Sequence, residues 1–130
     1  MIVLDASAAL ELLLVTDKGR SIAERIAPRD ESLHAPHLID LEVAQVLRRY
    51  VARVQIPEQR AREALDDFRD LDMNRYPHDV LLPRIWELRH NVSSYDAAYL
   101  SLAEVLEAPL LTTDARLARV VDTRAVIEVL

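Results

Sequence analysis

Short segments with strand character alternate along this chain with longer segments that favour helix. The expected strands are residues 1–5, 32–35, 71–76, 110–112 and 125–129. Helical spacing and propensity predict helices between them, at 6–15, 20–27, 38–54, 57–71, 78–91, 93–107 and 114–121. This alternation is typical of an α/β sandwich with a largely parallel sheet. We expect residues 1–130 to form one such domain.

The clearest helical pattern lies in residues 38–54. Its apolar side chains form one stripe, made of Ile39, Val43, Val46, Leu47, Tyr50 and Val54. The stretch RRYVARVQIP at 48–57 carries further apolar residues outside that stripe, which indicates a dimer face or a groove for a partner. The aromatic residues Phe68, Trp86 and Tyr95 are predicted to pack in the core. Tyr95, beside Asp96, could instead stack on a nucleobase.

Composition excludes several classes of site. The chain has no cysteine, so it cannot form a disulfide or a thiolate metal site. Its single glycine, Gly19, excludes a P-loop and a G-x-G-x-x-G turn. No apolar run approaches the roughly 20 residues of a membrane span, and no basic segment of a signal peptide precedes the apolar start. We therefore expect a cytoplasmic protein without a membrane partner.

The net charge of −6 argues against a passive nucleic-acid binder, which would neutralise phosphates with Lys and Arg. It does not exclude an enzyme whose clustered acids hold a divalent cation, because the ion inverts the local field. The acidic residues that could serve such a site are therefore of most interest.

Four acids stand at informative places. Asp5 and Asp114 each follow an apolar strand, Asp96 opens a helix, and Glu42 flanks the apolar stripe of 38–54. Each also has a purely structural interpretation, because Asp favours helix caps and first turns and Glu42 could be a solvated helix acid. Asp40 competes with Glu42, and helical spacing does not separate the two.

The joint placement of these acids favours a chemical role. In a parallel sheet, strand ends and the helix starts that follow them share one edge, so these carboxylates should converge there. Converging carboxylates raise one another's pKa or need a cation, and oxygen-only ligation suits Mg²⁺ or Mn²⁺. Ser7 and Thr112 could orient the carboxylates or bound waters. Such an ion activates water for attack on phosphorus.

Four segments also carry a family resemblance. They are MIVLDASAAL at 1–10, PHLIDLEVAQVLRR at 36–49, SSYDAAYLSLAE at 93–104 and LLTTDARLA at 110–118. In their order and spacing, the chain resembles the PIN-domain family, and more narrowly the VapC-type toxin ribonucleases of toxin–antitoxin systems. The resemblance implies a three-layer sandwich with a central, mostly parallel sheet, and an endoribonuclease that depends on Mg²⁺ or Mn²⁺.

The resemblance also implies roles for individual residues. The acidic quartet falls on Asp5, Glu42, Asp96 and Asp114, with Asp5, Asp96 and Asp114 holding the metal and Glu42 helping to ligate it or to position the water. The accompanying hydroxyls fall on Ser7 and Thr112. For the family, Glu42 rather than Asp40 is the expected acid.

Further expectations concern partners. Lys18, Arg20 and Arg116 are candidates for contacts with the RNA backbone, although solvated helix faces or local ion pairs explain them equally well. The resemblance implies a homodimer and a cognate antitoxin that lays a short helix into a groove. Two rival functions stay open: a non-catalytic PIN-like interaction module, and an RNA-processing or DNA nuclease on the same fold.

Overall fold

The computed structural model describes residues 1–130 and contains one sheet of five parallel strands. Their order across the sheet is β3-β2-β1-β4-β5. The strands are β1 (Ile2–Leu4), β2 (Leu33–Pro36), β3 (Met73–Tyr76), β4 (Leu110–Thr112) and β5 (Ile127–Val129). Every strand expected from the sequence is present, and the first strand of the chain lies at the centre of the sheet.

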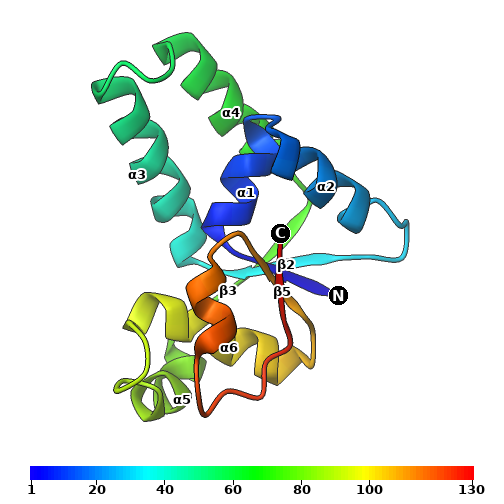
Figure 1. The fold of residues 1–130 in the computed structure, drawn as a ribbon, viewed down its shortest axis with the longest axis vertical. Coiled ribbons are helices and arrows are strands. Elements are labelled where there is room, and N and C mark those ends of the chain that lie inside the picture. Colours follow the sequence, from blue (N-terminus) through cyan, green and yellow to red (C-terminus); the bar gives the residue numbers. More distant parts are fainter.

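Helices cover both faces of this sheet. They are α1 (Ala6–Leu13), α2 (Asp17–Ile26), α3 (Leu38–Ala52), α4 (Glu58–Asp70), α5 (Leu82–Glu87) and α6 (Ser94–Leu106), with 3₁₀ turns η1 (Asp79–Leu81) and η2 (Ala115–Arg119). Helices α1 to α4 lie on one side of the sheet and α5 and α6 on the other (Figure 1). The predicted three-layer α/β sandwich is therefore confirmed.

The register of β1 determines which residues meet at the carboxyl edge of the sheet. Val3 pairs with His34 of β2 on one side and with Leu110 of β4 on the other. Because helices cover both faces, all three residues of β1 are buried and apolar. Leu4 is opposite Leu111, so Asp5 and Thr112 emerge side by side at one edge.

The only glycine makes a close helix contact possible. A Cβ atom on Gly19 would lie 2.0 Å from the carbonyl oxygen of Glu11. Helix α2 therefore packs on α1 at a distance that no other residue type permits without a backbone shift. Thr16 caps α2 at this point, since its side chain accepts a hydrogen bond from the Gly19 N–H at 3.0 Å.

Two sequence predictions near α5 were wrong. The helix expected over 78–91 is divided into η1 and the short α5, because Pro83 lacks an N–H and suits only a first helical turn. Trp86 is 67% exposed rather than a core residue, and the Arg89 guanidinium carbon lies 4.6 Å from the centroid of its ring. A helix this short buries one face, and Ile85 occupies it.

Tyr95 also departs from its predicted place in the core. It is 67% exposed at the start of α6, whereas Phe68 is buried as predicted. Tyr95 lies in the first turn of α6, directly after the N-cap Ser93 and Ser94, and its ring faces solvent there.

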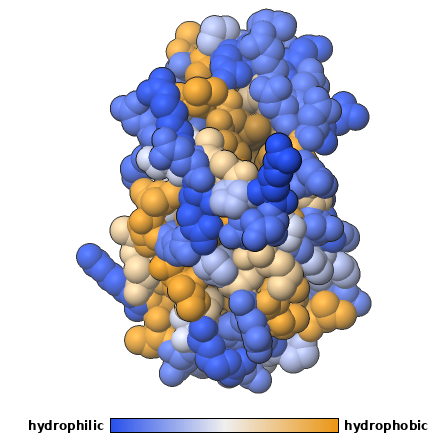
Figure 2. Space-filling model, turned by 90° about the vertical axis from the view of Figure 1, so that its right-hand side faces the viewer, coloured by the Kyte–Doolittle hydropathy of each residue, from blue (hydrophilic) through white to orange (hydrophobic).

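One face of the molecule shows how its hydrophobic side chains are distributed. On the face drawn in Figure 2, hydrophobic residues form separate patches between hydrophilic ones. None of the helices is both long and apolar enough to cross a membrane.

Candidate active site

Asp5 lies at the carboxyl end of β1 and is buried, with 7% of its surface exposed. Its Oδ1 atom caps α1 by accepting the Ala8 N–H at 2.9 Å. The same carboxylate accepts the Ser7 hydroxyl at 2.6 Å and the Thr112 hydroxyl at 2.5 Å. The structural interpretation and the chemical one are therefore compatible, because one carboxylate both starts a helix and faces the sheet edge.

The two predicted hydroxyls tie β1 to β4. The Oγ atom of Ser7 lies 3.3 Å from the Oγ1 atom of Thr112 and accepts the Thr113 N–H at 3.1 Å. Thr112 Oγ1 in turn accepts the Asp114 N–H at 3.0 Å. This network holds Asp5 in one orientation and fixes the backbone that carries Asp114.

The structure separates Glu42 from Asp40. Glu42 accepts a hydrogen bond at 2.6 Å from the hydroxyl of Tyr99, a buried residue of α6. Asp40 instead forms an ion pair at 2.7 Å with Arg75 of β3. Residues two apart on a helix point to different sides, so only Glu42 faces the other acids.

Asp96 lies in the first turn of α6. Its N–H donates to the Ser93 hydroxyl, which caps the helix, at 3.2 Å. Its half-buried carboxylate forms no ion pair, in contrast to Asp114, which binds the Arg116 guanidinium at 2.7 Å. Asp96 and Tyr99 are three residues apart on one helix and so share a face.

Three of the four acids have raised pKa values. Burial, chiefly, raises the pKa of Asp5, against the hydrogen bonds from Ser7 and Thr112, and Asp96 adds to the rise. Burial also raises the pKa of Glu42, where Asp5 and Asp96 contribute in the same direction. Mutual effects of this kind mean that these carboxylates lie in one another's electrostatic field.

Asp114 also contributes to the electrostatic field around these carboxylates. Burial raises the pKa of Asp96, and the charge of Asp114 raises it further. The pKa of Asp114 itself is lowered, because Arg116 donates to its carboxylate. Arg116 thus balances one of the four negative charges and leaves the other three without an ion-pair partner.

The donor chemistry fits a hard divalent cation. All four side chains offer carboxylate oxygens, the ligands that Mg²⁺ and Mn²⁺ prefer. As they stand, however, no three His, Asp or Glu side chains are grouped closely enough to hold a metal ion. The structure therefore brings the acids into one electrostatic neighbourhood, without a closed set of ligands.

Two neighbouring hollows adjoin this site. One, of about 340 Å³, lies beside Ser7 and Thr113. The other, of about 330 Å³, reaches the exposed Tyr95. Glu42, Val46 and Arg49 line both, so the two hollows meet along α3.

The predicted RNA-contacting residues have unequal surroundings. Arg20 is ion-paired with Asp17 at 2.8 Å within α2, and Arg116 is engaged with Asp114. Lys18 is exposed on α2 and forms no ion pair. Lys18 and Arg20 both lie on α2, and their contact with RNA stays a prediction.

Sequence reasoning missed two residues of this region. Tyr99 follows Asp96 by three positions, and Arg49 follows Glu42 by seven, so each shares a helical face with an acid. That spacing was the available signal.

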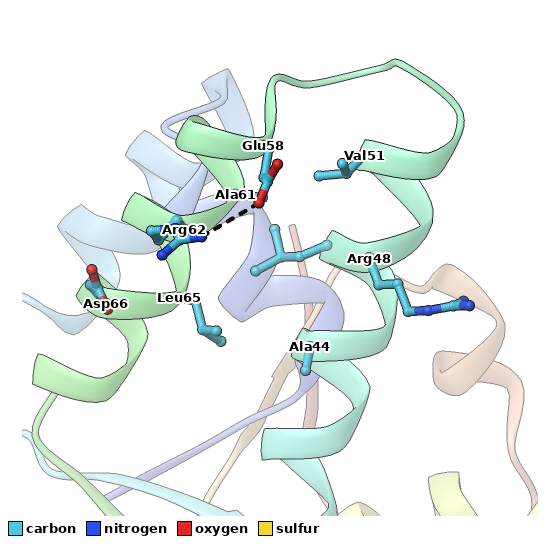
Figure 3. A pocket seen from close by; sticks show the side chains of 9 residues that line it. Ala44, Arg48, Val51, Glu58, Ala61, Arg62, Leu65 and Asp66 are labelled. Carbon is cyan, nitrogen blue, oxygen red and sulfur yellow. Dashed lines mark hydrogen bonds and ion pairs between the residues drawn. The ribbon is translucent and has the colours of Figure 1, made fainter.

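The largest hollow, of about 520 Å³, lies elsewhere, between α3 and α4 (Figure 3). Its apolar lining is Ala44, Leu47, Val51, Ala61 and Leu65. Charged residues surround it, among them Glu58 and Arg62, which form an ion pair at 3.4 Å. None of the four acids lines this groove.

Comparison with known proteins decides the family. The model of the PIN domain matches residues 2–123, which include all four acids. This chain belongs to the PIN-domain family. Among curated PIN-domain relatives, the VapC ribonuclease Mb0985 of Mycobacterium bovis is 46% identical over 117 residues, 90% of this chain and 88% of that protein. Ribonuclease VapC1 of Mycobacterium tuberculosis is 48% identical over 118 residues, 89% of this chain and 87% of its own length.

Solved structures agree on the PIN-domain fold. The structure of VapBC2 from Rickettsia felis, bound to a DNA fragment from the promoter, matches with a TM-score of 0.74. The match covers 100% of this chain and 99% of that chain at 15% identity, so it bears on the fold alone. The two curated relatives place the present chain among the VapC-type PIN domains.

Proposed function

We propose that this chain is a metal-dependent endoribonuclease, the toxin of a type II toxin–antitoxin pair. The observation that carries the proposal is the convergence of Asp5, Glu42, Asp96 and Asp114 in one electrostatic field, in a chain 46% identical to a VapC ribonuclease. Acids that raise one another's pKa destabilise the metal-free fold, and a cation between them would remove that cost.

In this proposal, Asp5, Asp96 and Asp114 hold Mg²⁺ or Mn²⁺, and Glu42 positions the attacking water. The bound ion would lower the pKa of that water and stabilise charge on the phosphate as the P–O bond breaks. Ser7 and Thr112 hold both oxygens of Asp5, which keeps this carboxylate in place. The Tyr99 hydroxyl donates to one oxygen of Glu42, Oε1, and so orients that carboxylate.

Basic residues would bind the polyanionic substrate. Arg116 is exposed beside Asp114 and could turn from this carboxylate to an RNA phosphate once a cation has taken its place. Lys18 and Arg20 of α2 are proposed as weaker contacts farther along the backbone. Such contacts offset the net charge of −6, which would otherwise repel RNA.

The partners follow from the same family. We propose a homodimer, and an antitoxin that covers the apolar groove between α3 and α4 with a short helix (Figure 3). The Rickettsia felis relative is itself a VapBC2 complex, which supports an antitoxin partner. The cytoplasm, where RNA is made and translated, is the proposed place of action.

The test compares Asp5→Asn and Asp96→Asn with the control Asp67→Asn, an exposed acid of α4. Purified proteins are incubated with single-stranded RNA, structured RNA and DNA, in Mn²⁺ and in EDTA. We expect cleavage of RNA in Mn²⁺ by the parent and the control only, with all circular dichroism spectra unchanged.

Other outcomes identify the rivals. Cleavage by both site variants, or cleavage in EDTA, would refute the proposed chemistry. Preferential cleavage of DNA would favour a DNA nuclease. A folded parent that cleaves nothing and binds no Mn²⁺ in calorimetry would favour the non-catalytic module.

A further inference from the structure

Arg49 is an unpaired cation in the two hollows that Glu42 also lines. Its side chain lines both hollows that meet at Glu42. The guanidinium of Arg75 is paired with Asp40 and that of Arg116 with Asp114, but Arg49 has no carboxylate partner although Glu42 lines the same walls. Because the Arg49 guanidinium has no ion-pair partner, it is available to bind an anion that must come close to Glu42.

Tyr95 supplies the second element of the same hollow. It is 67% exposed, directly precedes Asp96, and lines the hollow together with Arg49. An aromatic ring kept in water at the rim of a site is well suited to stack on a nucleobase. The exposed amide of Gln45 lies on the same wall and offers both a donor and an acceptor.

We propose that this hollow is a nucleotide subsite for single-stranded RNA, next to the phosphate that is cut. One base stacks on Tyr95, and the neighbouring backbone phosphate binds Arg49. The inference rests on the proposed endoribonuclease function and adds residues that hold the substrate. It also explains how a phosphodiester approaches Glu42 and Asp96, whose charges alone would repel it.

The composition of the hollow favours a nucleotide over a protein segment. Its volume of about 330 Å³ is walled by an aromatic ring, a guanidinium and an amide, with the apolar Leu41 and Val46 between them. A ring, a cation and an amide match a base, a phosphate and a base edge in turn. Glu42 itself lines the hollow and Tyr95 directly precedes Asp96, so a nucleotide bound there would lie next to two of the acids.

The experiment uses Arg49→Gln and Tyr95→Leu in the full chain. Arg53→Gln, at the exposed end of the same helix, is the matched charge control. Tyr95→Phe keeps the aromatic ring and tests whether the ring alone is sufficient for RNA binding. Cleavage of single-stranded RNA in Mn²⁺ yields kcat and KM, and anisotropy of a short fluorescein-labelled oligouridylate in EDTA measures binding without cleavage.

We expect Tyr95→Leu to weaken oligouridylate binding by at least about fivefold, with Tyr95→Phe restoring it. Arg49→Gln should raise KM and reduce the slope of log affinity against log salt by about 0.7, the loss of one phosphate contact. Arg53→Gln should change neither the binding nor the slope.

The outcomes separate this subsite from the function itself. If the parent cleaves RNA while Arg49→Gln and Tyr95→Leu bind and cleave like it, the subsite is refuted and the function stands. If the parent cleaves no RNA in Mn²⁺, the proposed ribonuclease function is refuted, and the subsite that rests on it is refuted as well. A change in sedimentation mass for Tyr95→Leu would show that the hollow joins two protein chains, which also overturns the subsite.

Discussion

The hydroxyl of Tyr99 lies 2.6 Å from Oε1 of Glu42 and joins α6 to α3 within the acid cluster. Tyr99 is 2% exposed, so this hydrogen bond replaces the water that both groups lose on folding. The pKa of Tyr99 is raised, first by burial and then by the charge of Glu42, so its hydroxyl keeps its proton and remains a donor. Through this bond the buried core orients an acid of the site.

Removing that hydroxyl should therefore impair turnover more than folding. We expect Tyr99→Phe to lower kcat for RNA cleavage by about tenfold, the equivalent of one buried hydrogen bond to a charged group, with KM little changed. The control is Tyr76→Phe, which loses a 2.7 Å contact with His34 away from the acids. Equal kcat values for the two variants would show that Tyr99 serves folding alone.

The choice between Glu42 and Asp40 can be tested directly. Glu42→Gln should abolish cleavage, because it removes a charge that lies in the field of Asp5 and Asp96. Asp40→Asn removes an exposed ion pair with Arg75 and should keep activity, at a stability cost of about 0–1 kcal/mol. Steady-state rates and urea midpoints of the two variants provide the check. An inactive Asp40→Asn protein with normal stability would reverse the assignment.

The raised pKa values make a prediction about stability and pH. A carboxyl whose pKa is higher in the folded state destabilises the fold as pH rises from its unfolded pKa through its folded pKa, because the unfolded chain gives up that proton more readily. Burial and Asp114 raise the pKa of Asp96. Asp96→Asn should therefore raise the Tm of the metal-free protein at pH 7.5, and the gain should vanish as pH falls below 4.

Mn²⁺ provides the complementary measurement. It should raise the Tm of the parent at pH 7.5 and do so less at pH 5, because protonated carboxyls are poor ligands. In Asp96→Asn, the response to Mn²⁺ should be smaller at both pH values. An unchanged Tm in the parent, at Mn²⁺ concentrations that support cleavage, would argue against these acids as ligands.

Gly19 should tolerate no side chain. A Cβ atom there would meet the Glu11 carbonyl oxygen at 2.0 Å, so Gly19→Ala must push α2 away from α1. We expect a loss of about 1–3 kcal/mol in the free energy of unfolding, as for other overpacked sites. Ser21→Ala, on the exposed face of α2, is the control and should be nearly neutral. If Gly19→Ala were more stable than the parent, α2 could move away from α1 without cost, and the close contact at Gly19 would not limit the side chain there.

Glu104 should stabilise the fold in a pH-dependent way. Burial alone would raise the pKa of Glu104, but Arg84, the Arg124 N–H and the Thr123 hydroxyl outweigh it and lower the pKa to about 2. Since the folded pKa lies below the ordinary value of 4.5, this stabilisation is present above pH 4.5 and disappears as pH falls toward 2.

We therefore expect Glu104→Gln to lose about 1–3 kcal/mol at pH 7 and much less near pH 3. The exposed Glu107→Gln serves as control, and urea unfolding at several pH values supplies the measurement. A difference between Glu104→Gln and the parent that does not change with pH would contradict the ion-pair explanation.

The sequence by itself determined the parts whose signal is local. The strands ending at Asp5 and before Asp114, the caps at Ser93 and Asp5, and the buried part of the α3 stripe follow from patterns within a few residues. The prediction was wrong for Val54, which lies after the end of α3 and is 89% exposed. Alternation of strands and helices then predicted the parallel sheet, whose carboxyl edge collects strand ends. For this reason the neighbourhood of the acids could be anticipated before any coordinates.

Only the tertiary structure decided which side chains face that edge. Glu42 and Asp40 differ by two positions on one helix, and it is the docking of α3 against α6 and β3 that pairs one with Tyr99 and the other with Arg75. The exposure of Tyr95 likewise depends on how the first turn of α6 packs against the rest of the fold. Contacts between distant segments arise from packing, which local periodicity does not encode.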